Sequence, residues 1–192
     1  MEYLLIGYLL GSTPFGLLLC FLFGYGDIRK IGSGNIGATN VLRTGNKFLA
    51  LITLILDILK GGIAVLIAKK FAMENNIAVY AGLFAIIGHN FPLWLKFKGG
   101  KGIATTIGTI IVISPIIGSI VISIWALVAF MFKYSSLAGM LSLISAPIIA
   151  IIFKLNHLIL PFSIITVMAL IKHRKNIVQL INGTEPKIKI KK

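Results

Sequence analysis

A glycine-rich segment at residues 32–43 holds the densest group of side chains suited to chemistry. It reads Gly32-Ser33-Gly34-Asn35-Ile36-Gly37-Ala38-Thr39-Asn40-Val41-Leu42-Arg43. Closely spaced glycines let backbone N–H groups converge on an anion, and the guanidinium of Arg43 matches the geometry of a phosphate. The segment also contains G-x-G-x-x-G, but a dinucleotide site needs a preceding strand in a βαβ unit, and an apolar run precedes it here. We therefore predict an anion site; a flexible solvated connector is the alternative.

Lysines and glycines are interleaved in a second segment, which follows Gly88-His89-Asn90-Phe91-Pro92. It reads Phe97-Lys98-Gly99-Gly100-Lys101-Gly102 and opens directly into an apolar run. The spacing does not fit a Walker P-loop, but a helix N-terminus beside two ammonium groups favours a bound phosphate. Attraction of the lysines to anionic lipid headgroups is the alternative. His89 alone is equally consistent with a packed polar residue and a site residue.

Two further groups of charged residues have more than one interpretation. The segment Lys172-His173-Arg174-Lys175-Asn176-Ile177, with Glu185 beyond it, is typical of a basic anchor at the cytoplasmic end of a membrane helix. Asp57 and Lys60 stand three residues apart in an apolar run and share a helix face. Burying either charge alone in a bilayer costs about 2.5–3.5 kcal/mol, so we expect them to be paired. A structural ion pair and a catalytic role are both open.

The composition excludes a soluble domain as the framework for these segments. Of 192 residues, 57% are hydrophobic and only 12% are charged, whereas soluble domains carry about 25% charged residues. The mean hydropathy is +0.98. A single cysteine, Cys20, excludes an intrachain disulfide. The chain is therefore predicted to be an integral membrane protein.

Apolar runs organise the chain into membrane spans, which need about 17–25 residues each. The runs are 3–23, 48–68, 77–95, 103–132, 137–153 and 158–171. The fourth is too long for one span and has Ser114-Pro115 near its middle, so we expect two shorter helices there, folded as a hairpin. In the first run, Gly7-x-x-x-Gly11 predicts a face of close helix packing. The prediction is a single all-α domain over 1–192 with about seven transmembrane helices; five spans is the alternative.

The basic residues set the expected topology. With the N-terminus outside and the C-terminus in the cytoplasm, fifteen basic residues fall on the cytoplasmic side and three outside, with Lys60 inside a span. This distribution obeys the positive-inside rule and puts the glycine-rich loops on the cytoplasmic side, where they would form the site. The net charge of +14 is then explained by membrane topology, and we expect no nucleic acid partner.

Several catalytic classes lack their residues in this chain. There are three histidines and five acidic residues, with no H-E-x-x-H motif or Cys/His cluster, so we expect no metal. No G-x-S-x-G nucleophile motif occurs, and nothing in the sequence indicates a cofactor. What remains is a set of cations and glycine-rich loops at one membrane face, which is suited to holding phosphate beside lipid.

Together the three segments resemble the signatures of the bacterial acyl-phosphate:glycerol-3-phosphate acyltransferase family, PlsY. The resemblance is carried by residues 32–43, by Gly88-His89-x-x-Pro92 with residues 97–102, and by Lys172-His173 with Asn176-Ile177. Asp57-x-x-Lys60-Gly61, Tyr134-Ser135-Ser136-Leu137 and Glu185 also fit, and the resemblance covers essentially the whole chain. It implies transfer of a fatty acyl group from acyl phosphate to the sn-1 hydroxyl of glycerol 3-phosphate. The products would be lysophosphatidic acid and inorganic phosphate, in bacterial phospholipid biosynthesis.

The resemblance also implies which residues form the site. The catalytic set, which would hold glycerol 3-phosphate, is Ser33, Arg43, Lys101, His173 and Asn176. The set for acyl phosphate and its leaving phosphate is Gly37, Thr39, Asn40, Lys98, Gly99 and Gly100. A supporting set comprises His89, Ser136, Asp57, Lys60 and Glu185. The general base is open between His89, His173 and a phosphate oxygen of the substrate.

The expected partners are acyl phosphate, glycerol 3-phosphate and membrane lipid, with no obligate protein partner. The expected location is the bacterial inner membrane, crossed several times, with the active site on the cytoplasmic side. A membrane carrier for phosphate or organophosphate anions is the alternative function. Carriers usually bind substrate near the bilayer midplane and often contain internal repeats, whereas these motifs are expected at one face and no repeat is visible.

Overall fold

The computed structural model describes residues 1–188, apart from the side chain of Asn75, and every regular element in that range is a helix. The longer helices are α1 (Glu2–Ser12), α2 (Phe15–Leu22), α4 (Lys47–Phe71), α5 (Asn75–Asn90), α6 (Ile103–Ile113), α7 (Pro115–Phe132), α8 (Ser135–Ile152), α9 (Asn156–Lys172) and α10 (Arg174–Ile181). The short ones are η1 (Ile28–Lys30), α3 (Ala38–Val41), η2 (Leu42–Thr44) and η3 (Leu93–Leu95). The predicted all-α class is confirmed. The chain divides into two compact units, Met1–Ser114 and Pro115–Lys192.

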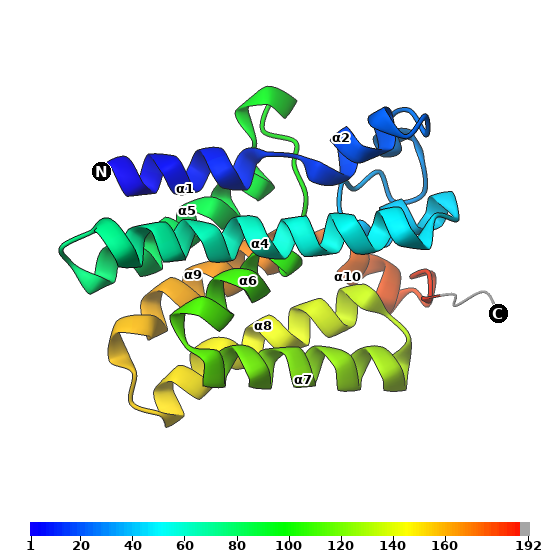
Figure 1. Ribbon diagram of the computed structural model, residues 1–192. Coiled ribbons are helices and arrows are strands. Elements are labelled where there is room, and N and C mark those ends of the chain that lie inside the picture. The colour runs from blue at the N-terminus through cyan, green and yellow to red at the C-terminus, as the bar shows by residue number, and fades with distance from the viewer. Residues whose placement is uncertain (189–192) are drawn as a thin grey trace. The chain divides into compact units, whose positions relative to one another are not determined.

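In the first unit, α5 packs against α1 and α4, and α6 packs against α4 and α5 (Figure 1). Glycines on α1 allow its close approach to α5. A Cβ atom at Gly7 or Gly11 would overlap the backbone carbonyl oxygen of Ala81 or Ala85. The predicted packing face is therefore confirmed. Small residues are typical of such interfaces because van der Waals packing drives helix association in membranes.

The first predicted span is broken rather than continuous. α1 and α2 are separated by Thr13 and Pro14, and proline has no N–H to donate to a helix. Side chains from other elements bond the carbonyls at the break. Trp94 Nε1 donates to the carbonyl of Ser12 at 2.9 Å, and Lys60 Nζ donates to that of Thr13 at 2.9 Å. The carbonyl groups of Ser12 and Thr13 at the break are therefore satisfied by hydrogen bonds from other elements.

In the second unit, α8 packs against both α7 and α9 (Figure 1). Thr166 on α9 donates to the carbonyl of Leu143 on α8 at 2.8 Å. The chain bends by 61° between α9 and α10, at His173. This unit begins where α6 ends at Ile113 and α7 starts at Pro115, so the predicted break within 103–132 is confirmed.

The described residues contain five to six candidate membrane spans. Five segments are long and apolar enough: Glu2–Leu22, Lys47–Phe71, Asn76–Leu95, Pro115–Phe132 and Ser135–Ile152. The bent pair of α9 and α10 makes a sixth. α6 has 11 residues and rises only about 17 Å, against about 30 Å of hydrocarbon. By length and composition, therefore, fewer segments qualify than the seven predicted.

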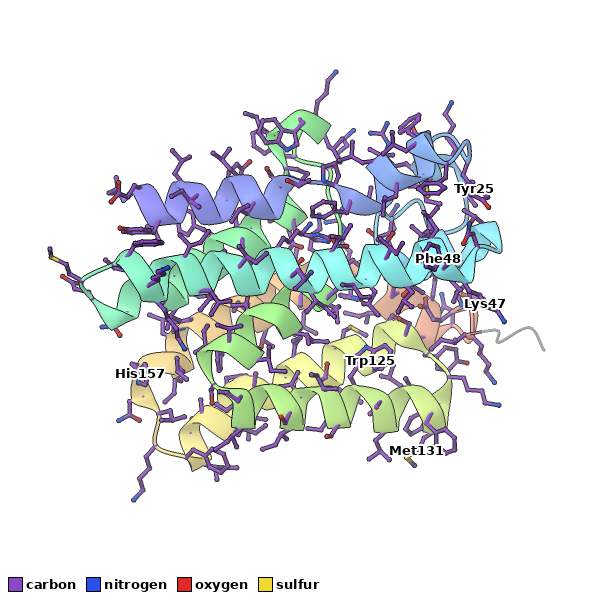
Figure 2. All side chains as sticks on the ribbon, in the orientation of Figure 1. Tyr25, Lys47, Phe48, Trp125, Met131 and His157 are labelled. Carbon is purple, nitrogen blue, oxygen red and sulfur yellow. The ribbon has the colours of Figure 1, made fainter. Side chains whose placement is uncertain are left out.

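Many large apolar side chains are exposed on the outer faces of the helices. Phe48 on α4 and Met131 on α7 are 66% and 61% exposed, and Met131 projects away from α7 in Figure 2. The buried side of α4 carries Asp57 and Lys60 instead. An apolar exterior with charged groups inside is the arrangement expected of helices surrounded by lipid.

Candidate active site

Asn40, on α3, organises the first glycine-rich segment. Its side chain is buried, and its Nδ2 donates to the carbonyls of Ile28, Ile31 and Asn35 at 2.8–3.0 Å. Its Oδ1 accepts from the backbone N–H of Ser33 at 3.0 Å. Both ends of the amide are thus bonded to the loop. The Asn40 side chain therefore holds the loop together through hydrogen bonds within the protein, whereas we expected it to contact acyl phosphate.

Arg43, in η2, lies against the same loop. Gly32 has a φ of +56°, and a Cβ there would lie 2.6 Å from Arg43 Cδ and 2.8 Å from Nη1. Glycine suits this position because it adopts positive φ readily and has no side chain to collide with Arg43. Arg43, Ser33 and Thr39 are exposed. Among residues 1–188, no hydrogen bond or ion pair engages the Arg43 guanidinium. Its charge is therefore available to an anion.

An ion pair anchors the start of this loop. Asp27 caps η1 by accepting from the backbone N–H of Arg29 at 3.0 Å, and the Arg29 side chain donates to both carboxylate oxygens at 2.7 and 2.8 Å. Hydrogen bonding from the Arg29 side chain lowers the pKa of Asp27 from 3.8 to about 2. Between the two, Ile28 is fully buried. The pair thus fixes one end of the segment that Asn40 closes.

The second segment folds back onto the end of α5. The N–H groups of Gly99 and Gly100 donate to the carbonyls of Asn90 and His89, at 3.2 and 3.0 Å. We expected these amides to cradle acyl phosphate, but they are occupied, because backbone donors within reach of a carbonyl pair inside the protein. The glycines instead allow close packing. A Cβ at Gly99 would overlap the His89 carbonyl, and one at Gly100 would overlap the His89 ring.

Lys98 and Lys101 belong to this folded turn. Lys98 is exposed and Lys101 is partly buried. Leu95, at the end of η3, packs on an apolar cluster that the first segment also contributes to. That cluster consists of Leu17, Cys20, Ile28, Ile36, Val41, Leu49 and Ala50. The two segments that carry Arg43 and the lysines therefore share one apolar core.

A buried charged cluster lies on α4 and α5. Lys60 Nζ is 2.7 Å from Asp57 Oδ1, which confirms the predicted pairing. His89 Nδ1 lies 3.7 Å from the same oxygen. All three side chains are at most 4% exposed. His89 is therefore enclosed between a carboxylate and the backbone of the second segment.

In the second unit, Glu185 connects two other predicted site residues. Ser136 Oγ donates to Glu185 Oε1 at 2.5 Å, and Asn176 Nδ2 donates to Oε1 and Oε2 at 2.8 and 3.0 Å. His173 is buried, and its Nδ1 lies 2.7 Å from the carbonyl of Ala169. A carbonyl can only accept, so Nδ1 carries the hydrogen. Nε2 is then the acceptor of the neutral ring.

The predicted site residues fall into one group per unit. The first unit holds Ser33, Gly37, Thr39, Asn40, Arg43, Asp57, Lys60, His89, Lys98, Gly99, Gly100 and Lys101, and the second holds Ser136, His173, Asn176 and Glu185. Among the described residues, no group of three or more His, Cys, Asp or Glu side chains could hold a metal ion.

The hydrogen bonds that Trp94 and Lys60 donate to the carbonyls of Ser12 and Thr13, at the break in the first span, were not predicted from the sequence. Pro14 is the sequence feature that could have indicated this break.

Comparison with known proteins gives consistent matches over nearly the whole chain. A family model described as glycerol-3-phosphate acyltransferase matches residues 1–183. Glycerol-3-phosphate acyltransferases from Mesorhizobium japonicum and Rhodospirillum rubrum are 54% and 50% identical. The matches cover 96% and 98% of this chain, and 94% and 90% of those proteins.

Two crystal structures share the fold. Both are of PlsY (YgiH), an integral membrane glycerol 3-phosphate acyltransferase, in its glycerol 3-phosphate and lysophosphatidic acid forms. Their TM-scores are 0.92 and 0.90, at 34% identity, and the matches cover 98% of this chain and 94% of those chains. The predicted enzyme class and the multi-pass membrane character are thereby confirmed, and the chain belongs to the PlsY family of integral membrane glycerol-3-phosphate acyltransferases.

Proposed function

We propose that the protein transfers a fatty acyl group from acyl phosphate to the sn-1 hydroxyl of glycerol 3-phosphate. The hydroxyl oxygen forms an ester bond to the acyl carbon while the bond from that carbon to the phosphate oxygen breaks. Inorganic phosphate leaves, and lysophosphatidic acid is the other product. The glycerol 3-phosphate and lysophosphatidic acid forms of the related PlsY support the acceptor and the product. The three sequence motifs support acyl phosphate as the donor.

The exposed guanidinium of Arg43 is the observation that carries the proposal. It packs closely against Gly32, and no hydrogen bond or ion pair within residues 1–188 engages it. Lys98 and Lys101 stand on a second loop that packs on the same apolar cluster. Both substrates carry phosphate, so the site must offset several negative charges beside lipid, where unpaired charge is costly. Arg43, which packs against Gly32 and has no carboxylate partner within residues 1–188, meets this need.

Five residues are assigned to glycerol 3-phosphate: Ser33, Arg43, Lys101, His173 and Asn176. Arg43 and Lys101 supply positive charge for the phosphate, and Arg43 can bind it through two parallel hydrogen bonds. In the second unit, Asn176 Nδ2 is directed at Glu185. These bonds hold the side-chain amide in one orientation, and we assign Asn176 to a glycerol hydroxyl.

The acyl-phosphate headgroup is assigned to Gly37, Thr39 and Lys98, with Asn40, Gly99 and Gly100 building the loops that hold them. Acyl phosphate is a mixed anhydride and already activated, so orientation and electrostatic stabilisation of the leaving phosphate supply most of the rate. This explains how a site with few acidic residues and no nucleophilic motif performs acyl transfer.

The proton of the attacking hydroxyl is assigned to a phosphate oxygen of the substrate. His89 is a poor candidate because its ring is enclosed between Asp57 and Gly100. His173 Nε2 is an acceptor in the neutral ring, and we assign it a hydrogen bond to the acceptor substrate rather than the role of base. Substrate-assisted proton transfer needs no further protein group.

The whole chain is proposed to act as one catalytic domain in the bacterial inner membrane. The match to residues 1–183 spans both compact units and supports this. Counting α6 as a short segment of its own gives seven segments, with the N-terminus outside and the C-terminus in the cytoplasm. Fifteen basic residues then fall on the cytoplasmic side and three outside, as the positive-inside rule requires. The glycine-rich loops, and with them the active site, face the cytoplasm.

The experiment uses the purified full chain in detergent with palmitoyl phosphate and glycerol 3-phosphate. Phosphate release and lysophosphatidic acid are followed together, and palmitoyl-CoA is the rival donor. We expect equal amounts of the two products from palmitoyl phosphate alone, and strong loss in Lys101→Ala. Turnover with palmitoyl-CoA would overturn the donor assignment. Absence of product from both donors in folded protein would overturn the proposed reaction and favour an anion carrier, which vesicle uptake would then reveal.

A further inference from the structure

Three titratable side chains that make no proposed substrate contact lie together inside the first unit. Asp57, Lys60 and His89 are 2%, 3% and 4% exposed. Burying charges is expensive even when they are paired, and well-packed apolar residues often replace such pairs without loss of stability. A cluster of this kind on two apolar helices, α4 and α5, indicates a role beyond stability, and its contacts show what that role is.

Lys60 connects the cluster to the loop that carries Arg43. Its Nζ donates at 2.9 Å to the carbonyl of Thr13, at the break between α1 and α2. The same ammonium lies 5.7 Å from the ring centre of Phe15, the first residue of α2. One residue later, α2 meets the glycine-rich loop so closely that a Cβ at Gly16 would overlap the carbonyl oxygen of Ile36. Lys60 therefore holds the start of the helix on which that loop rests.

His89 connects the cluster to the loop that carries Lys101. Its Nδ1 faces Asp57 Oδ1 at 3.7 Å, and its Nε2 lies directly against Gly100. Its backbone carbonyl accepts from the N–H of Gly100 at 3.0 Å. Both the ring and the backbone of His89 thus support the residue that immediately precedes Lys101.

We infer that Asp57, Lys60 and His89 are positioning residues for acyl transfer. Asp57 contacts both Lys60, which supports the loop that carries Arg43, and His89, which supports the loop that carries Lys101. On one side, Asp57 fixes Lys60 and hence α2 beneath the first loop. On the other side, it fixes the His89 ring beneath Gly100. Arg43 and Lys101 are thereby held in the positions in which both can bind the same phosphate. The inference rests on the proposed assignment of these two cations to glycerol 3-phosphate.

The test replaces the charged pair by apolar residues of similar size, in the full chain. The double variant Asp57→Leu/Lys60→Met leaves no unpaired buried charge, so it separates positioning from stability. We expect its thermal unfolding midpoint to fall only slightly, because the carbonyl of Thr13 loses the donor Lys60, while the KM for glycerol 3-phosphate rises at least tenfold. Lys69→Met is the matched control, because Lys69 on the same helix also donates to a backbone carbonyl, that of Val112. Its KM should stay within twofold of the wild type.

A stable double variant with a wild-type KM would overturn the inference and leave the cluster as a structural ion pair. If the double variant does not fold, His89→Gln provides the decisive measurement, because it keeps the Asp57–Lys60 pair. It should raise the same KM at least fivefold, and a wild-type KM in folded His89→Gln would overturn the inference. Lys101→Ala is assayed in parallel. An unchanged KM there would show that the proposed phosphate contact is itself wrong, whereas a raised KM beside a normal double variant would reject the positioning role alone.

Discussion

The side-chain amide of Asn176 donates to both carboxylate oxygens of Glu185, at 2.8 and 3.0 Å. Ser136 donates to the same carboxylate at 2.5 Å. Glu185 is only 9% exposed, and it lies nine residues beyond Asn176 in a segment without regular structure. One carboxylate therefore joins the start of α8, the helix α10 and the segment that follows it. It also fixes the direction in which the Asn176 carbonyl oxygen points.

Removing this carboxylate should disorient Asn176. Glu185→Leu leaves the donors of Ser136 and Asn176 unpaired, a loss of about 1–3 kcal/mol for each unsatisfied buried group. We expect a lower thermal midpoint and a fall in kcat/KM for glycerol 3-phosphate of at least tenfold. Glu185→Gln keeps one accepting oxygen and should be intermediate in both measurements. Equal activity in the two variants would contradict the proposed orienting role.

Replacing Arg43 by lysine should reduce activity although the charge is kept. A hydrogen bond to a charged group contributes about 1.5–3 kcal/mol, and lysine loses the two-point contact of the guanidinium with phosphate. We expect Arg43→Lys to lower kcat/KM by about 10- to 100-fold. The measurement is steady-state kinetics at varied glycerol 3-phosphate. Arg174→Lys on α10 serves as control and should behave like the wild type; a similar loss there would point to a general effect of arginine replacement.

His173→Ala should weaken the use of glycerol 3-phosphate without flattening the dependence of rate on pH. The ring donates through Nδ1 to the carbonyl of Ala169, which orients Nε2, and we assign the proton to a substrate phosphate oxygen. The pH–rate profile of the variant, measured at saturating substrate, should keep its shape. Loss of the pH dependence would instead identify His173 as the general base. His157→Ala, at an exposed histidine on α9, is the matched control.

The contact between Gly100 and the His89 ring should appear as an energetic coupling. Gly100→Ala places a Cβ on His89 Nε2, so it should lower the thermal midpoint. Combining it with His89→Ala should relieve the overlap, with a coupling of about 0.5–3 kcal/mol. Gly99→Ala is the control, because its Cβ would meet the backbone carbonyl of His89, which His89→Ala leaves in place. Additive effects in the Gly100 pair would refute the contact.

Asp27 should titrate well below an ordinary aspartate. Hydrogen bonding from Arg29 lowers the pKa of Asp27 from 3.8 to about 2. Because the pKa is lower in the folded protein, the pair stabilises the loop fully above pH 3.8, and this contribution is lost as the pH falls through about 2. Carboxyl chemical shifts measured by NMR should show the low midpoint. In Arg29→Gln the midpoint should move back towards 3.8, and an unchanged midpoint would rule out Arg29 as the cause.

Proline illustrates how far the sequence alone could predict the fold. The break at Ser114-Pro115 was expected because the run was too long for one span, and α6 and α7 meet there. Pro14 also breaks a span, whereas Pro147 and Pro161 lie inside α8 and α9. The residue type is the same in all four cases. At Pro14, the break is stabilised by donors from Lys60 and Trp94, which no local pattern reveals.

The sequence by itself determined the membrane class, the approximate spans, the positions of the two glycine-rich loops that we propose bind anions, and the family. These follow from local properties: apolar length, glycine spacing and residue type, which need no knowledge of distant contacts. Only the tertiary structure decided which polar groups remain for substrate. It bonds Asn40 and the amides of Gly99 and Gly100 within the protein, and it leaves Arg43 exposed. Because each donor pairs with whichever acceptor the folded chain brings within about 3 Å, contacts such as Lys60–Thr13 and Asn176–Glu185 arise from packing.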